Sequence, residues 1–134
     1  MSNQWPAPLV GDLVWCWFPQ PPDTGPGPKP RPALVIGVDS RTDGVIVTAV
    51  YGTSQRVDRL MAGEFAITRS SHPQAFALAG LAYDTKFNFK AVIDLPWGEA
   101  FFKVSPRPRY GQTPKLGSLH PSLLRAAQAA FGAR

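Results

Sequence analysis

Prolines and glycines cut this chain into short segments, and their number is the feature that most limits its fold. The sequence holds 15 prolines and 12 glycines in 134 residues, which favours short strands joined by turns over a helical bundle. Apolar residues make up 44% of the chain, enough for one sizeable core at this length. We therefore expect a single domain over residues 1–134, with a loose lead over residues 1–9, where Pro6 and Pro8 forbid a regular element.

Apolar runs between the turns predict six or so short strands and one helix. The expected strands cover residues 11–18, 33–38, 45–51, 63–68, 85–90, 92–95 and 100–104, whereas residues 75–81 form only a small apolar patch. The one convincing helix follows Pro121, because five apolar residues repeat there at helical spacing: Leu123, Leu124, Ala127, Ala130 and Phe131. Together these elements predict a mostly β fold, a small SH3-like, partly closed antiparallel barrel with a C-terminal helix across one end.

Charge and cysteine content bear on the partners and the compartment. The net charge is +5, and residues 100–134 hold six basic side chains and no acidic one, which favours an anionic partner but is weak evidence for nucleic acid by itself. The only cysteine, Cys16, lies in an apolar run and is expected to be a buried structural residue. The N-terminus has no signal-peptide pattern, and no apolar run approaches the ~20 residues that span a bilayer. We therefore expect a cytoplasmic protein without membrane contact.

Familiar catalytic and cofactor motifs are absent from the sequence. Two isolated histidines, one cysteine and scattered acids give no metal-ligand spacing. The chain also lacks a phosphate-binding glycine loop and a nucleophile elbow. His72 precedes a proline in a turn and His120 lies at the helix start, so we interpret both as structural. We expect no metal and no cofactor, which leaves metal-free chemistry or none.

One arginine lies in an unusual setting at the start of an apolar strand. Arg31 is held between Pro30 and Pro32, which fix their own φ angles, and Pro32 also pushes Arg31 towards extended geometry. A guanidinium held so firmly at the mouth of a sheet is suited to grip a phosphate. The alternative is that Arg31 simply solvates the strand end. Spacing alone favours this alternative, because surface arginines far outnumber catalytic ones.

Other polar groups fall where they could serve metal-free RNA cleavage. Thr53 and Ser54 follow a strand with exposed hydroxyls, and Lys86, Asn88 and Lys90 share one face of an alternating strand. In such a reaction the substrate's 2′-hydroxyl attacks the adjacent phosphorus, so the protein has to orient the phosphate, neutralise its charge and move protons. The polar face of the strand fits a binding groove or a solvated outer face, and alternation alone favours the solvated face.

Six short stretches, taken together, form a more specific pattern. They are Gly-Asp-Leu-Val-Trp at 11–15, Pro-Arg-Pro-Ala-Leu-Val-Ile at 30–36, Val-Thr-Ala-Val-Tyr-Gly-Thr-Ser at 47–54, Ala-Gly-Leu at 79–81, Thr-Lys-Phe at 85–87 and Leu-Gly-Ser-Leu at 116–119. In order and spacing they cover most of residues 11–131, and the Arg-Pro strand is the most specific of them. With this pattern the chain resembles the PemK/MazF family of toxins from bacterial type II toxin–antitoxin modules, which reverses the preference at Arg31.

The resemblance implies an SH3-like barrel, commonly a homodimer, that acts as a metal-independent endoribonuclease on single-stranded RNA. It also implies 2′,3′-cyclic phosphate and 5′-hydroxyl products, and inhibition by a cognate antitoxin protein in the RNA groove. Arg31 matches the family's catalytic arginine, as proton donor or transition-state clamp, and Thr53 matches its phosphate-binding threonine. The loop over residues 20–30 corresponds to the mobile loop beside the groove. Further substrate contacts are expected from Lys29, Ser54, Gln55, Lys86 and Asn88.

The chain departs from one pattern within that family. Some members carry an Arg and an Asp as an acid/base pair on the strand after the Gly-Leu element, whereas residues 82–88 here contain Asp84 and no arginine. Either Arg31 and Thr53 suffice, as other members suggest, or activity is weak, altered or absent. The alternative function is a non-catalytic RNA- or protein-binding module with the same barrel.

Overall fold

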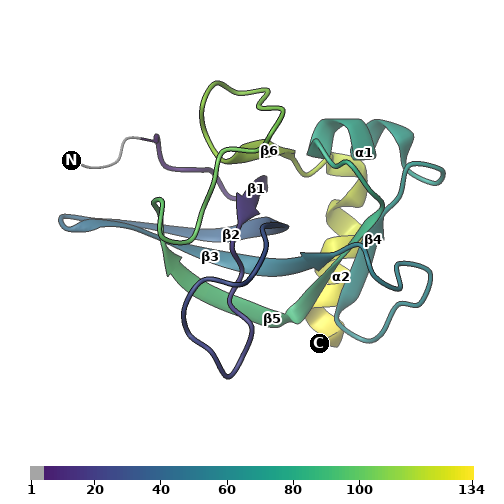
Figure 1. Cartoon of the computed structure of the whole chain (residues 1–134). Coiled ribbons are helices and arrows are strands. Elements are labelled where there is room, and N and C mark those ends of the chain that lie inside the picture. Colours follow the sequence, from purple (N-terminus) through teal and green to yellow (C-terminus); the bar gives the residue numbers. More distant parts are fainter. Residues whose placement is uncertain (1–4) are drawn as a thin grey trace.

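Six strands and three helical segments make up the computed structural model, which describes residues 5–134 (Figure 1). The strands are β1 (Asp12–Cys16), β2 (Arg31–Arg41), β3 (Gly44–Thr53), β4 (Glu64–Ile67), β5 (Thr85–Pro96) and β6 (Lys115–Ser118). The helices are α1 (Pro73–Ala79), the 3₁₀ turn η1 (Pro121–Leu123) and α2 (Leu124–Ala133). None of these helices is long and apolar enough to cross a membrane.

The predicted loose lead falls partly outside the described residues, which begin at Trp5. Residues 5–9 form neither helix nor strand. They are nevertheless attached to the fold, because the Trp5 ring packs edge-on against Trp97 at 5.9 Å and the Trp97 indole N–H donates to the Pro6 carbonyl oxygen at 3.1 Å.

All six strands belong to one antiparallel sheet in the order β4-β5-β3-β2-β1-β6. The edges are β4 and β6, so the sheet does not close into a continuous hydrogen-bonded barrel within the described residues. The C-terminal helix α2 packs against β4 and β5, and α1 packs against β6. The predicted mostly β fold with a C-terminal helix is confirmed.

The longest strand, β5, runs unbroken where the sequence predicts two separate strands over residues 85–90 and 92–95. Its pairing with β3 jumps from Val50–Val92 to Tyr51–Asn88. The three residues between Asn88 and Val92 therefore leave the ladder without ending the strand, as in an enlarged β-bulge. Because of the bulge, the single strand β5 pairs with both halves of β3.

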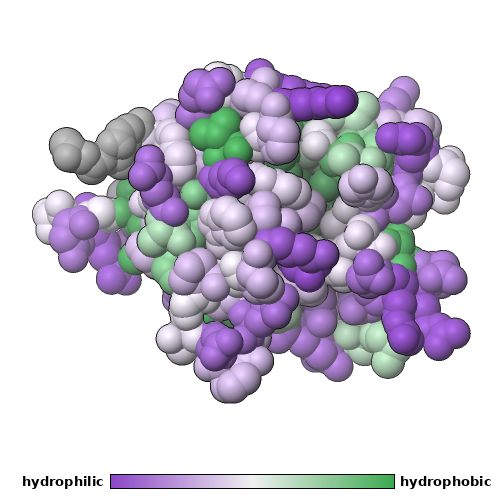
Figure 2. All heavy atoms as spheres, viewed as in Figure 1, coloured by the Kyte–Doolittle hydropathy of each residue, from purple (hydrophilic) through white to green (hydrophobic). Residues whose placement is uncertain are grey.

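Side chains of the sheet alternate between two apolar clusters, one on each face. On one face Leu13 and Phe87 pack with residues of α1 and α2. On the other face Val14 and Ala33 pack with Phe102 from the segment after β5. Because both faces are covered, the buried stretches 13–16 of β1 and 33–35 of β2 are apolar throughout. Hydrophobic residues exposed on the face turned to the viewer form only small separate patches (Figure 2).

Two predictions about the chain between residues 73 and 104 are wrong. Residues 73–79 form α1 where the sequence indicates only an apolar patch, because a helix of seven residues is too short to show a clear period. The sequence does carry its boundary signals, Pro73 in the first turn and Gly80 in the left-handed conformation after the last. Residues 100–104 form no strand, and only Phe102 makes a bridge, to Cys16.

The helix α1 and the strand β6 approach so closely that only glycine fits between their backbones. A Cβ atom at Gly80 would lie 1.9 Å from the carbonyl oxygen of Leu116, and one at Gly117 would lie 2.1 Å from that of Leu78. The two glycines thus allow backbone to pack directly on backbone. This contact fixes α1 beside β6.

Gly117→Ala is expected to lower the free energy of unfolding by about 2–3 kcal/mol, because the added methyl group has to push β6 away from α1. Gly25→Ala is the control, since a Cβ there has nothing within 4 Å, and it should change stability by less than about 0.5 kcal/mol. Urea denaturation followed by tryptophan fluorescence measures both. Equal stabilities for the two variants would contradict the close packing of α1 on β6.

Candidate active site

The two residues predicted to act in catalysis lie at the same end of two neighbouring strands. Arg31 is the first residue of β2, and Thr53 is the last residue of β3. The ladder pairs Ala33 with Tyr51, and continuing this register by two residues sets Arg31 opposite Thr53. Residues directly opposite each other on antiparallel strands point to the same face, with Cβ atoms about 4.5–5.5 Å apart. Arg31 and Thr53 are therefore neighbours on one face of the sheet.

Arg31 is half-buried and is supported by an aromatic ring. Its guanidinium carbon lies 5.4 Å from the centre of the Tyr51 ring, within range of a cation–π interaction. Tyr51 in turn packs edge-on against Phe18, with ring centroids 5.2 Å apart. Nε of Arg31 is buried and has no hydrogen-bond partner among the described residues. The guanidinium is thus oriented by its ring contact while one of its donors is unpaired.

Thr53 is partly exposed at the turn that follows β3. Its Oγ1 accepts the Gln55 N–H at 3.1 Å, which fixes the oxygen and leaves the hydroxyl hydrogen free to donate. Ser54 and Gln55 are both exposed on this turn. The predicted hydroxyl cluster therefore does project from the strand end, beside the position of Arg31.

Lys86 does not present a free ammonium on this face. The register sets it opposite Thr53, but its Nζ donates to Oε1 of Glu64 at 2.9 Å and to the Arg59 carbonyl oxygen at 3.0 Å. Both side chains of the ion pair are only 9% exposed. Oε1 of Glu64 also accepts the Met61 N–H at 2.8 Å. The pair therefore anchors the loop after β3 to β5, and a ligand could use Lys86 only by breaking it.

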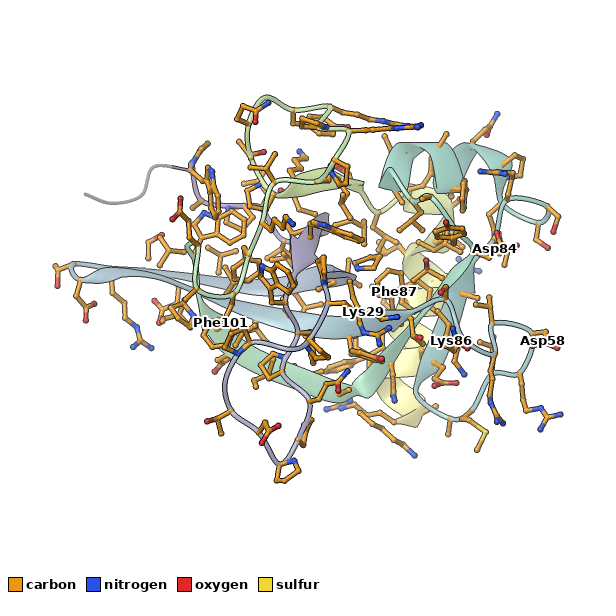
Figure 3. All side chains as sticks on the ribbon, in the orientation of Figure 1. Lys29, Asp58, Asp84, Lys86, Phe87 and Phe101 are labelled. Carbon is orange, nitrogen blue, oxygen red and sulfur yellow. The ribbon has the colours of Figure 1, made fainter. Side chains whose placement is uncertain are left out.

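The remaining predicted contacts lie around the same end of the sheet. Asn88 is paired with Tyr51, and its Oδ1 accepts the Lys90 N–H at 2.9 Å. Lys29 is exposed at the end of the proline-rich loop that leads into β2. In Figure 3, Lys29 and Lys86 lie towards this end, whereas Asp58 is on the outside of the loop after β3.

Sequence reasoning missed two side chains that support the site. Tyr51 lies two residues before Thr53 on the same strand, so the strand period of two could have placed it on the face of Thr53 and Arg31. Glu64 carries no comparable signal. Its pairing with Lys86 joins positions 22 residues apart, and only the register of β4 with β5 brings the two together.

The side chains best suited to proton transfer are engaged elsewhere. His72 and His120 each use Nδ1 to accept a backbone N–H of their own turn, at 3.3 and 3.0 Å. Oδ1 of Asp84 accepts the Arg69 N–H at 2.8 Å. Within residues 5–134, no three His, Cys, Asp or Glu side chains gather in a group that could hold a metal ion. Arg31 and Thr53 thus stand without a nearby acid/base partner that hydrogen-bonds to either of them in the described chain.

A solved structure with the same fold is an endoribonuclease. The chain is similar to an endoribonuclease from Mycobacterial species in complex with its cognate antitoxin, with a TM-score of 0.56 and 20% sequence identity, over 94% of this chain and 92% of that chain. No protein-family model matches the chain, and no curated protein matches it. At this identity the likeness shows a shared fold.

Lys86→Met is expected to destabilise the fold by about 3 kcal/mol, because it leaves the Glu64 carboxylate buried without its counter-charge. Lys90→Met is the matched control on the same strand, where the side chain is exposed and the change should stay within about 0.5 kcal/mol. Lys86→Met/Glu64→Gln should recover part of the loss, because the amide oxygen can still accept the Met61 N–H. If Lys86→Met unfolds at the same urea concentration as Lys90→Met, the ion pair does not anchor the loop.

The Cys16 thiol is buried, as predicted, and burial raises its pKa to about 12. Because this lies above the pKa of an unfolded thiol, about 8.5, the thiolate fraction at pH 8 should be about 10³-fold lower in the folded chain. We expect no reaction with a disulfide reagent at pH 8 until guanidinium unfolds the chain. Stability should also fall as pH rises above about 8.5, where the unfolded thiol ionises. Prompt labelling of the folded chain would refute this burial.

Proposed function

We propose that this chain is a PemK/MazF-like toxin that cleaves single-stranded RNA in the cytoplasm without a metal ion. The observation that carries the proposal is the placement of Arg31 and Thr53 as neighbours on one face, at the ends of β2 and β3. The likeness of the fold to an endoribonuclease in complex with its antitoxin supports the same chemistry here.

The proposed reaction uses the nucleophile that RNA itself carries. The 2′-oxygen attacks the adjacent phosphorus, the bond from phosphorus to the 5′-oxygen breaks, and a 2′,3′-cyclic phosphate and a 5′-hydroxyl end are formed. One proton leaves the 2′-hydroxyl and one reaches the departing 5′-oxygen, so an acceptor and a donor are required. Negative charge grows on the phosphate oxygens in the transition state, and stabilising that charge is the main task of the protein.

We assign this task to Arg31, with Thr53 as its partner. A guanidinium offers a planar fork to two phosphate oxygens, and Nε of Arg31 is a donor in need of an acceptor. Because Nε is shielded, the side chains that cover it have to shift before a phosphate can reach it. Thr53 adds its hydroxyl hydrogen to the same phosphate, since its oxygen already accepts the Gln55 N–H. Ser54 and Gln55 then contact the adjoining nucleotide from the exposed turn.

A cognate antitoxin and a second copy of the chain are the proposed protein partners. A net charge of +5 would attract both RNA and an acidic inhibitor segment. An apolar groove of about 570 Å³ lies between β2 and α2, and Leu124 and Phe131 beside it are 51% and 44% exposed. Apolar surface of this kind supports a homodimer in which the second copy covers it.

One observation favours a second candidate, a binding module that holds RNA or protein without cutting it. Both histidines and Asp84 are engaged in other hydrogen bonds. In the described chain, no carboxylate or imidazole is hydrogen-bonded to Arg31 or Thr53 to move protons. A site that grips phosphate but lacks an acid/base partner would bind RNA and leave it intact.

Arg31→Ala is expected to lower RNA cleavage by about 10²–10³-fold or more while the fold remains. Arg31→Lys should recover little of the loss, because an ammonium keeps the charge but not the fork. The measurement is cleavage of single-stranded RNA in excess chelator, with the 2′,3′-cyclic ends identified by their resistance to phosphatase. Arg41→Ala is the matched control, since Arg41 lies at the far end of the same strand and pairs with Asp39 in solvent. It should cut at the parent rate.

Three outcomes separate the candidates. If Arg31→Ala cleaves RNA at the parent rate, Arg31 has no catalytic role. Binding of RNA by the parent chain with no cleavage, in chelator or in Mg²⁺, would support the binding module. In cells, induced expression of an active toxin should arrest growth, whereas expression of Arg31→Ala should not.

A further inference from the structure

A second hollow opens at the same end of the sheet as Arg31. It encloses about 660 Å³, a size typical of pockets that hold small ligands. Three of its lining residues are arginines, Arg69, Arg107 and Arg109, and we call it the arginine pocket. Pro32, which directly follows Arg31 on β2, also lines it.

The arginine pocket and Arg31 lie on opposite faces of the sheet. Trp15 lines the pocket and is paired with Pro32, whereas Cys16 is paired with Arg31, and successive residues of a strand point to opposite faces. The loop between β5 and β6 touches both faces: Phe102 packs with Cys16 on the face of Arg31, and Arg107 and Arg109 further along the loop line the pocket.

The lining of the arginine pocket carries only positive charge, and the acidic side chain beside it is Asp84, which accepts the backbone N–H of Arg69 at 2.8 Å. No carboxylate lines it, and no ion pair involves any of its three arginines within residues 5–134. Three like charges around one hollow repel each other, so a bound anion would be stabilised by all of them. Strongly hydrophilic side chains lie along this upper edge of the molecule, over α1 and the loop between β5 and β6 (Figure 2).

Two of the arginines are held in place, and the third is free. Nη1 of Arg109 donates to the Ala77 carbonyl oxygen of α1 at 3.0 Å. The guanidinium carbon of Arg69 lies 4.8 Å from the centre of the Phe76 ring, also on α1. Arg107 makes no side-chain hydrogen bond, ion pair or ring contact in the described part of the chain. Arg107 is therefore the side chain most available to an incoming anion.

The remaining walls of the arginine pocket suit a flat, aromatic ligand. Trp15 is half-buried in the pocket wall, and Tyr83 is 74% exposed at its rim. Nucleic-acid bases stack on such rings whatever their sequence. A bare phosphate would leave both rings without a contact. A nucleotide can contact both kinds of group, because its phosphate pairs with the guanidinium groups and its base stacks on the aromatic rings.

We propose that the arginine pocket binds a nucleotide that flanks the cleaved phosphate, with Arg107 on its phosphate and Tyr83 against its base. The proposal rests on the proposed cleavage of RNA at Arg31. Arg31 and Pro32 are consecutive on β2 and point to opposite faces of the sheet. An RNA strand that passes the ends of β2 and β3 can therefore reach both Arg31 and the arginine pocket. The pocket would thus hold RNA in register for cleavage without taking part in the reaction.

The test measures binding of a fluorescent, mixed-sequence, single-stranded 2′-O-methyl RNA, which lacks the nucleophile and stays intact. Fluorescence anisotropy over a range of salt concentrations gives the affinity and its salt dependence. Arg107→Ala should weaken binding about tenfold and lower the slope of log K against log salt by about 0.7, the value for one phosphate contact on a single strand. Tyr83→Ala should weaken binding about tenfold through lost stacking.

Arg125→Ala is the matched control, because Arg125 is exposed on α2 and lies outside the arginine pocket. It should bind within about twofold of the parent. Arg107 and Tyr83 are also exposed, and circular dichroism checks that their variants stay folded. Parental affinity and salt slope for both Arg107→Ala and Tyr83→Ala would overturn the proposal, whether or not the parent cleaves RNA.

Two further outcomes separate the pocket from the proposed function and from another partner. If the parent fails to cleave unmodified RNA while both pocket variants lose affinity, the pocket is supported and the nuclease proposal fails. The last experiment measures binding of a fluorescent poly-glutamate peptide, which stands for an acidic protein segment. If Arg107→Ala binds RNA normally but loses this peptide, the pocket serves an acidic protein segment and the nucleotide assignment is wrong.

Discussion

The hydrogen-bonded ladder between β2 and β3 is the constraint on which the rest of the structure depends, because it lies at the centre of the six-stranded sheet. A slip of one residue would send Arg31 to the face opposite Thr53. Hydrophobicity alone does not set this register, since residues 33–38 in the middle of β2 are apolar on both faces. Two local features set it instead: the tight turn that pairs Arg41 with Gly44, and a bulge at Ile36. The bulge shifts the ladder by one residue between the pairs Gly37–Thr48 and Val35–Ala49, and this shift sets Arg31 opposite Thr53.

The ladders on either side of β2 and β3 make a row of four side chains, Cys16, Arg31, Thr53 and Lys86, across one face of the sheet. The outer two are engaged, one as a buried thiol and the other in a buried ion pair. Such a pair contributes little net stability, but it ties the loop after β3 to β5 and so steadies the turn that carries Thr53. The row therefore leaves its two central members to face a ligand.

The parts of this site that could be predicted are those that depend on local sequence. Pro30 and Pro32 mark Arg31 within three residues, and a glycine at position 52 marks the end of an apolar strand beside Thr53. The burial of Lys86 could not be predicted, because alternation gives the face of a strand but not the partner that covers it. The arginine pocket was equally hidden, since its walls come from segments that only the complete fold brings together.

The environment of Arg31 distinguishes an arginine that binds an anion from one that is only solvated at the end of a strand. An arginine with that role keeps its donors in water, whereas Nε of Arg31 is shielded and unpaired, an arrangement that costs about 1–3 kcal/mol. The flanking prolines and the Tyr51 ring limit the freedom of the side chain, so less entropy is lost when a ligand binds. A phosphate that reached Nε would recover the desolvation cost at a guanidinium that is already oriented. The stored cost and the rigid placement together favour a guanidinium that grips an anion over one that only solvates the end of β2.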